Sequence, residues 1–310
     1  MPDLLDSEPA LAWKAAVLVR GLAPDSPEAK KAAETVRRSP LITALIEGRD
    51  RTGNMYRKWT GSHWVLSLLA DLGCPPGDPA LRPLMNEVLD GWLSPEHIRK
   101  HLRVLKGRAR RCGSQEGNAI WSSLRLGFAD SRTDELVRRL LEWQWPDGGW
   151  NCDKHPEADT SSFMETLIPL RALALYAGIA GDGKVNTAAQ RAAEVFLERR
   201  LFRRRRDGQV MDGHFLLLHY PAYWHYDILF ALKVMAEAGF ISDPRCREAL
   251  DLLESKRLAD GGFPAEESYA HATRPDVTGY SAVTWGGVSH TRPNPFVTAD
   301  ARYVLRAAGR

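Results

Sequence analysis

A repeated corner with a spacing of 56 residues constrains the fold of this chain most strongly. Leu-Glu pairs begin at Leu141, Leu197 and Leu253, and each is followed by a basic or aromatic stretch and then by Asp-Gly. A further helical pattern precedes each pair, so the predicted unit is two helices joined by a short connection. Repeats of this kind are typical of solenoids and of other arrays of helix pairs, which bury a core only by stacking.

The periodicity of the apolar residues predicts an all-α fold. Apolar side chains recur every three or four positions in nearly every long segment, and strand-like alternation is hard to find. Several patterns stop at a glycine (Gly73, Gly178, Gly239 and Gly309), which suits the left-handed residue that often follows a helix. We therefore predict a single domain over residues 1–310, with a helical lead-in at 1–55 and helix-hairpin repeats at 56–310.

The connections between the predicted helices are of two lengths. Those within a pair are short, whereas those between pairs are long, above all at 147–160, 207–221 and 260–295. Helix pairs arranged side by side place all connections of one kind at the same end of the molecule. Long loops in a compact domain usually carry function, so we expect the site at the end with the long loops.

The composition excludes several classes of protein. A formal net charge of +3 is too small for a nucleic-acid-binding protein. The four cysteines are widely spaced and favour free thiols in a reducing compartment. The N-terminal segment lacks the pattern of a signal peptide, and no run reaches the roughly 18 apolar residues of a membrane span. We expect a cytoplasmic protein without a transmembrane segment or a nucleic-acid partner, and the sequence leaves its oligomeric state open.

Two corners resemble a known superfamily. The helix and corner at residues 141–150, which contain WQWPDGGW, resemble the QW-type repeat of squalene–hopene cyclases, and LADGGFPAE at 258–266 resembles the corners of protein prenyltransferase β subunits. The resemblance covers about residues 60 to 310 and implies an α/α toroid of repeated helix hairpins, closed or incompletely closed, with a central cavity. The D-x-D-D acid of the cyclases and the D-x-C zinc ligands of the transferases are both missing, so no catalytic residue is carried over.

The densest polar and aromatic cluster is HYPAYWHYD at residues 219–227. If a helix begins near the proline, Tyr223 and Asp227 share one face, and with His225 they could perform general acid–base catalysis. His219 and Trp224 would then contact the substrate. The alternative is structural, with Asp227 pairing with an arginine or capping a repeat and His225 packing in the core.

A second cluster follows the first corner. Cys152, Asp153 and His155 could ligate zinc through sulfur, oxygen and nitrogen, and the last two could also contact substrate. Asp159 is a further candidate catalytic carboxylate. A capping-box spacing at 162–165 accounts for part of this segment, and a free cysteine is more often simply buried. No other cofactor is predicted.

Two charged features are also candidates. Glu116 is a possible second catalytic carboxylate near the start of a predicted helix, although an acid in a first turn ordinarily compensates the helix dipole. Arg203 lies in a basic run at 199–206 that could bind an anionic head such as a diphosphate. The alternative for this run is a solvated helix end.

The chain contains ten tryptophans, and several of them could form the walls of a cavity. Trp145, Trp150, Trp224 and Trp285 are the candidates, and Asn294 lies in the same last loop as Trp285. Because aromatic faces stabilise a developing carbocation, we expect a cyclase- or transferase-like enzyme acting on an isoprenoid or similarly apolar substrate. The alternatives are a non-catalytic ligand-binding or scaffold toroid, and a glycan-active hydrolase or lyase.

Overall fold

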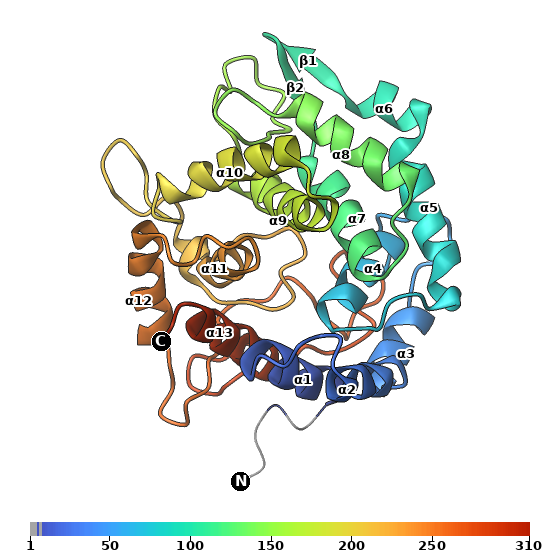
Figure 1. Cartoon of the computed structure of the whole chain (residues 1–310), viewed down its shortest axis with the longest axis vertical. Coiled ribbons are helices and arrows are strands. Elements are labelled where there is room, and N and C mark those ends of the chain that lie inside the picture. The colour runs from blue at the N-terminus through green and yellow to red at the C-terminus, as the bar shows by residue number, and fades with distance from the viewer. Residues whose placement is uncertain (1–4, 6–7) are drawn as a thin grey trace.

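The structure is a computed structural model that describes residue 5 and residues 8–310, and this part of the chain is mostly helical (Figure 1). Its thirteen α-helices are α1 (Pro9–Lys14), α2 (Pro27–Arg37), α3 (Pro40–Glu47), α4 (Ser62–Asp71), α5 (Arg82–Leu93), α6 (Pro95–His101), α7 (Gly113–Arg125), α8 (Ser131–Trp143), α9 (Phe163–Ala180), α10 (Gly183–Leu197), α11 (Ile228–Glu237), α12 (Arg247–Ser255) and α13 (Pro295–Ala307). Short helical turns lie at η2 (Ala15–Val19), η3 (Pro79–Leu81), η4 (Gly213–Leu216) and η5 (Pro244–Cys246).

A small β-hairpin interrupts the helices and was not predicted. Strand β1 (Arg103–Leu105) pairs antiparallel with β2 (Arg108–Arg110). Lys106 and Gly107, which join them, both have positive φ, the conformation of the two-residue turns that match strand twist. Three-residue strands are too short for alternation to reveal them in a sequence. The hairpin leads directly into α7.

The helices form consecutive pairs, as the repeat predicts. α4 packs on α5, α7 on α8, α9 on α10 and α11 on α12. The first helix of each pair also packs on the first helix of the next, through α4, α7, α9, α11 and α13. Ten of the 13 residues of α7 are buried, whereas α8 buries five, on one face. The first helices therefore make the interior and the second helices cover it, as Figure 1 shows.

The N-terminal and C-terminal helices meet. α1 and η2 both pack against α13, so the first and last parts of the described chain lie side by side (Figure 1). Trp13 of α1 also covers the end of α4, where a Cβ added to Gly73 would come within 2.2 Å of the indole ring. α1 thus packs between the last interior helix and the first.

The three corners are closed by similar pairs of backbone hydrogen bonds, and the middle corner is one residue longer than the other two. In the first, the amide of Trp145 donates to the carbonyl of Gly149 (2.8 Å), and the amide of Gly148 donates back to Trp145 (2.9 Å). The corresponding two bonds close the corners at residues 204–209 and 258–262. The indole of Trp145 donates to the carbonyl of Ala109 (2.7 Å), so this corner also anchors the β-hairpin.

The predicted helix ends are confirmed with one exception. Gly73, Gly239 and Gly309 follow helices and have positive φ. Gly178, in contrast, lies inside α9, which continues to Ala180 and ends at the left-handed Gly181. Leucine and alanine dominate this segment and favour continuation of the helix, so the earlier glycine does not stop it.

α9 is the one described helix that is long and apolar enough to cross a membrane, judged by length and composition. The core helix of a globular protein has the same properties. α9 packs against α7, α10 and α11, and it buries Arg171 within the protein. We therefore regard α9 as a core helix.

Candidate functional site

The space between the interior helices contains two cavities, and the smaller one adjoins the loop before α11. This smaller cavity has a volume of about 50 Å³, and residues 219–223 of the long loop before α11, which include the predicted His219 and Tyr223, contribute to its wall. A buried water needs roughly 10–15 Å³ of such volume, and a cavity that admits benzene has about 150 Å³. This cavity by itself is therefore too small for an isoprenoid substrate.

A cluster of buried charges lies between this cavity and a second one of about 220 Å³, near the ends of the interior helices. Asp71 accepts from Lys14 (2.7 Å) and Lys233 (2.6 Å), and the same two lysines pair with Asp300 (2.9 and 2.8 Å). Three cations and three carboxylates balance one another: Lys14, Arg171, Lys233, Asp71, Glu237 and Asp300.

Asp71 and Lys233 in this cluster are held in their charged forms by their partners. Burial alone would raise the pKa of Asp71, but Lys14, Lys233 and Arg171 hold it well below its usual value. The carboxylates of Asp300 and Asp71 outweigh burial at Lys233 and raise the pKa of this lysine. Asp71 and Lys233 therefore do not exchange protons near neutral pH, and the ion pairs of the cluster join α1, α4, α9, α11 and α13.

The predicted cluster at 219–227 is a loop, and the expectation that Tyr223 and Asp227 share a helical face is wrong. α11 begins only at Ile228, and Asp227 is its N-cap, with its carboxylate accepting from the amide of Phe230 (2.7 Å). The other carboxylate oxygen of Asp227 lies 2.8 Å from Nδ1 of the buried His219. Burial opposes the charged form of His219, but this carboxylate outweighs it and raises the pKa of the histidine.

The remaining residues of this loop form an aromatic stack. The ring of His225 lies between those of Trp224 and Tyr269, with centroids 4.0 and 3.4 Å away. Tyr223 stacks on Trp59 with centroids 3.9 Å apart. Burial lowers the pKa of His225 to about 3, so its ring is neutral at physiological pH. This arrangement is what the structural alternative for His225 predicts.

A larger pocket lies beside the start of α7, and we call it the α7 pocket. Its volume is about 460 Å³, within the range of ordinary ligand sites. Helices α5 and α6, the strand β2 and the loop after α8 all contribute to it. The lining residues are 53–56, Trp92, His97, His101, 110–112, Gln115, Cys152 and Lys154.

Arg110 is the most unusual residue of the α7 pocket. It is 1% exposed, yet no carboxylate pairs with it anywhere in the described residues. Its Nη1 donates to the carbonyl of Asp153 (3.3 Å), and its guanidinium lies 4.5 Å from the ring centroid of Trp145. Its Nε and Nη2 have no hydrogen-bond partner within residues 8–310. Because a buried charge is normally paired, we expect an anion to pair with the guanidinium of Arg110.

Arg111 lies close to the two histidines of the pocket and disfavours their charged forms. Burial and the adjacent Arg111 lower the pKa of His97 to about 4, and the same two causes lower that of His101. Arg111 itself is paired with Glu116 (2.8 Å) and also contacts Nε2 of His97 (2.9 Å). Glu116, a predicted catalytic carboxylate, is fully buried against this arginine, and burial raises its pKa.

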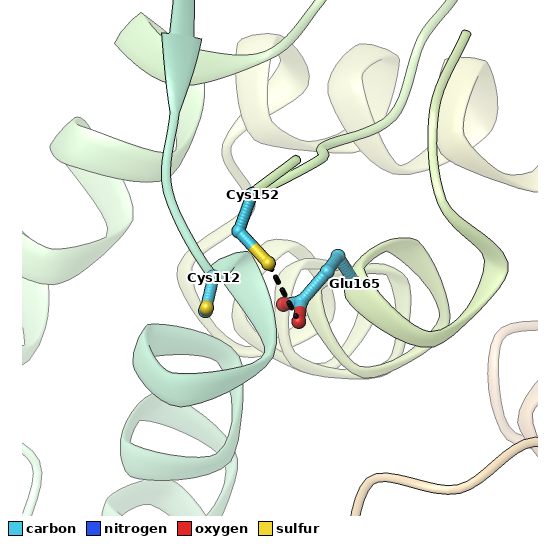
Figure 2. A group of neighbouring side chains, drawn as sticks. All are labelled: Cys112, Cys152 and Glu165. Carbon is cyan, nitrogen blue, oxygen red and sulfur yellow. Dashed lines mark hydrogen bonds between the residues drawn. The ribbon is translucent and has the colours of Figure 1, made fainter. Parts of the chain in front are cut away.

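Two thiols and a carboxylate meet at the edge of the same pocket, as Figure 2 shows. The sulfur atoms of Cys112 and Cys152 and a carboxylate oxygen of Glu165 all lie within 4.8 Å of one another. Both cysteines are free, as predicted. Hydrogen bonding to the thiol of Cys152 and burial raise the pKa of Cys112, and burial raises that of Glu165.

The predicted zinc ligands are only partly brought together. Cys152 belongs to the thiol–carboxylate group, but Asp153 and His155 do not. These two side chains are exposed, and the carboxylate of Asp153 accepts from the backbone amide of His155 (2.8 Å) in a local turn. Proximity in sequence was misleading here, because a turn of this kind directs successive side chains apart.

Three predicted substrate contacts have structural roles. Trp150 is 1% exposed, and its indole donates to the carbonyl of Leu140 (3.0 Å). Asn294 is the N-cap of α13 and also donates to the carbonyl of Trp285 (2.7 Å). Trp285 is buried and bonds to the hydroxyl of Ser281 (3.0 Å). None of them lines the α7 pocket.

The remaining two candidates lie away from any shared site. Arg203 pairs with Glu248, and residues 200 and 204–206 of the basic run also pair with carboxylates. The six arginines of the run share three carboxylates, so the run keeps a net positive charge, but it lies at a helix end outside the α7 pocket. Asp159 is exposed in the loop before α9.

Arg110, Cys112 and His97 were not singled out from the sequence. The available signals were weak: two arginines and a cysteine directly before a predicted helix, and His97 and His101 four residues apart in a segment that starts with Ser-Pro. Histidines at this spacing share a helical face. Only the structure shows that this face meets the arginines.

Comparison with known proteins adds little. No family model matches the chain, and no curated protein matches it. A solved structure described as a protein from Actinoplanes is similar, with 19% identity over 97% of this chain and 90% of that chain and a TM-score of 0.40. That score is too low to support an argument about fold or function.

Proposed function

We propose that this chain is an α/α toroid of repeated helix hairpins and that it binds a small molecule with an anionic head in the α7 pocket. The toroid is supported by the succession of contacts through α4, α7, α9, α11 and α13 and by the packing of α1 against α13. The similar corners at residues 145–149, 204–209 and 258–262 support a repeated unit of two helices. The resemblance to squalene–hopene cyclases and prenyltransferases implies an α/α toroid as well.

The unpaired guanidinium of Arg110 is the observation that carries this proposal. Its Nε and Nη2 are covered in this structure, so the proposal requires the side chain to shift toward the pocket, where both nitrogens could donate to a carboxylate or phosphate in the bidentate geometry that arginine favours. A buried cation without a counter-ion is costly, so an anion there would stabilise the protein as well as bind. His97, His101 and Lys154 add donors or positive charge around the same space.

The dimensions of the pocket indicate a ligand larger than its anionic head. A volume of about 460 Å³ leaves room for an apolar portion, and Tyr56 and Trp92 provide an apolar wall. Together with the resemblance, this favours an isoprenoid diphosphate, handled by a prenyltransferase- or cyclase-like enzyme at the α7 pocket rather than in a central cavity. The prediction of a cytoplasmic protein that does not act on nucleic acid is retained.

The other two functional classes, a glycan-active enzyme and a non-catalytic binding protein, have less support. A glycan-active enzyme needs two carboxylates facing one bond. Glu116 is buried against Arg111, Asp159 is exposed, and Asp227 caps α11, so the three candidates do not face a common space. A non-catalytic binding protein with the same anion site is the alternative, and turnover assays separate it from an enzyme.

Isothermal titration calorimetry with inorganic pyrophosphate and with an isoprenoid diphosphate tests the proposal. We expect Arg110→Gln to weaken both interactions at least about tenfold, since a charge-assisted hydrogen bond contributes roughly 1.5–3 kcal/mol. Arg103→Gln is the matched control, because Arg103 pairs with Arg110 across the hairpin but does not line the pocket. Equal affinity in the Arg110 variant and the wild type would contradict the proposal.

A further inference from the structure

We propose that Cys112, Cys152 and Glu165 form a zinc site whose fourth coordination position faces the α7 pocket. Thiolate and carboxylate ligands in a set of three are typical of zinc, and an open fourth position is typical of catalytic rather than structural sites. The inference goes beyond anion binding and does not rest on it, because the metal can be measured without any organic ligand.

The distances suit a tetrahedral ion with small adjustments. Zn–S bonds of about 2.3 Å and a Zn–O bond of about 2.0 Å require sulfur atoms about 3.8 Å apart and sulfur–oxygen separations of about 3.5 Å. The three ligand atoms lie within 4.8 Å of one another. Sγ of Cys152 is 3.5 Å from Oε1 of Glu165, which already matches the bound separation.

The ligands are held by bonds that leave their coordinating atoms free. The amide of Arg111 donates to the carbonyl of Asn151 (3.2 Å), so the segments carrying the two cysteines are joined by their backbones. Oε2 of Glu165 accepts from the amide (3.1 Å) and the hydroxyl (2.7 Å) of Ser114. This directs Oε1 toward the thiols (Figure 2), and such outer bonds fix ligand geometry in metal sites.

The surroundings also suit the charge of the occupied site. Two thiolates, one carboxylate and Zn²⁺ carry a net charge of −1, and the thiol protons are released to solvent on binding. Arg110 and Arg111 are adjacent to Cys112 in the chain and line the same pocket. Because both cysteines also line that pocket, the open position is accessible to water or to a ligand group there.

Metal analysis of the full chain tests the site. The protein is purified under reducing conditions without a metal-affinity column, zinc is quantified by mass spectrometry, and the apo-protein is titrated with Co²⁺ to detect thiolate-to-cobalt charge transfer. The variants are Cys112→Ser, Cys152→Ser, Glu165→Gln and Ser114→Ala. Cys74→Ala is the control, since Cys74 is a free, buried cysteine outside the pocket.

We expect one zinc ion per chain, a loss of affinity of at least tenfold in each ligand variant, and about 10–100-fold in Ser114→Ala. The control should bind zinc as the wild type does. Absence of the thiolate band in wild-type protein, or full zinc content in the ligand variants, overturns the proposal. If a serine variant fails to fold, alkylation of the wild type decides: zinc should protect Cys112 and Cys152, and equal labelling with and without zinc overturns the site.

Discussion

The substitution Asp71→Asn tests the role of the buried charge cluster. The carboxylate of Asp71 accepts from Lys14, from Lys233 and, at 3.1 Å, from the hydroxyl of Tyr220. Asparagine has nearly the same shape but no charge. The variant therefore leaves three cations against two carboxylates, with a net charge of +1 in a largely buried cluster.

The expected loss of stability follows from this unbalanced charge. Removing one partner of a buried ion pair costs about 3–5 kcal/mol. Unfolding entropy is about 2.1 cal/mol/K per residue, so for 310 residues the melting temperature should fall by about 5–8 °C. The double variant Lys14→Met with Asp71→Asn restores the charge balance and should lose less than the two single variants combined.

Urea unfolding followed by circular dichroism, together with calorimetry, measures these changes. Asp90→Asn is the control, because the carboxylate of Asp90 is 66% exposed and its pair with Arg132 should contribute less than about 1 kcal/mol. A loss below about 1 kcal/mol for Asp71→Asn, or strict additivity in the double variant, would refute the reasoning.

Three further predictions concern the corner, the capping histidine and the pocket. Gly148→Ala should destabilise the fold by about 1–3 kcal/mol in urea unfolding, because φ is +102° and the new Cβ would lie 2.3 Å from a backbone carbonyl. Gly208→Ala is the control at the middle corner, where a Cβ would meet no atom within 4 Å, and it should destabilise the fold less. Asp227→Asn should destabilise the protein most at acidic pH, because folding raises the pKa of His219. The ion pair of His219 with Asp227 stabilises the fold fully below the unfolded pKa of 6.5, and this stabilisation is lost as the pH rises through the folded pKa. A loss of stability that did not change with pH would contradict this prediction. Pyrophosphate binding at pH 5.5 should be accompanied by more proton uptake in the wild type than in His97→Gln, since a bound anion raises the pKa of His97 from about 4; equal uptake in calorimetry would exclude this histidine from the site.

The fold was largely predictable because its signals are local. Apolar residues at helical spacing and terminal glycines identify the helices, and the recurrence of Leu-Glu and Asp-Gly identifies three corners that are closed by similar pairs of backbone hydrogen bonds. The start of α11 was misplaced because Pro221 and Asp227 are both valid start signals. The bonds from Asp227 to Phe230 and His219 favour the later start.

The site was less predictable because its residues are far apart in the chain. Arg110 was overlooked because nothing in a sequence shows that a basic residue lacks a counter-ion in the fold. Glu165 was interpreted as part of a capping box for its own helix, whereas it bonds to Ser114 at the start of α7. The cysteine that partners Cys152 lies 40 positions earlier, at Cys112, rather than among its neighbours.

The measurement that tests the central claim most directly is a crystal structure of the protein soaked with pyrophosphate. We predict an oxygen of the anion about 2.7–2.9 Å from both Nε and Nη2 of Arg110, within the α7 pocket. An α7 pocket that contains only water at saturating pyrophosphate, with the guanidinium of Arg110 unchanged, would contradict the account.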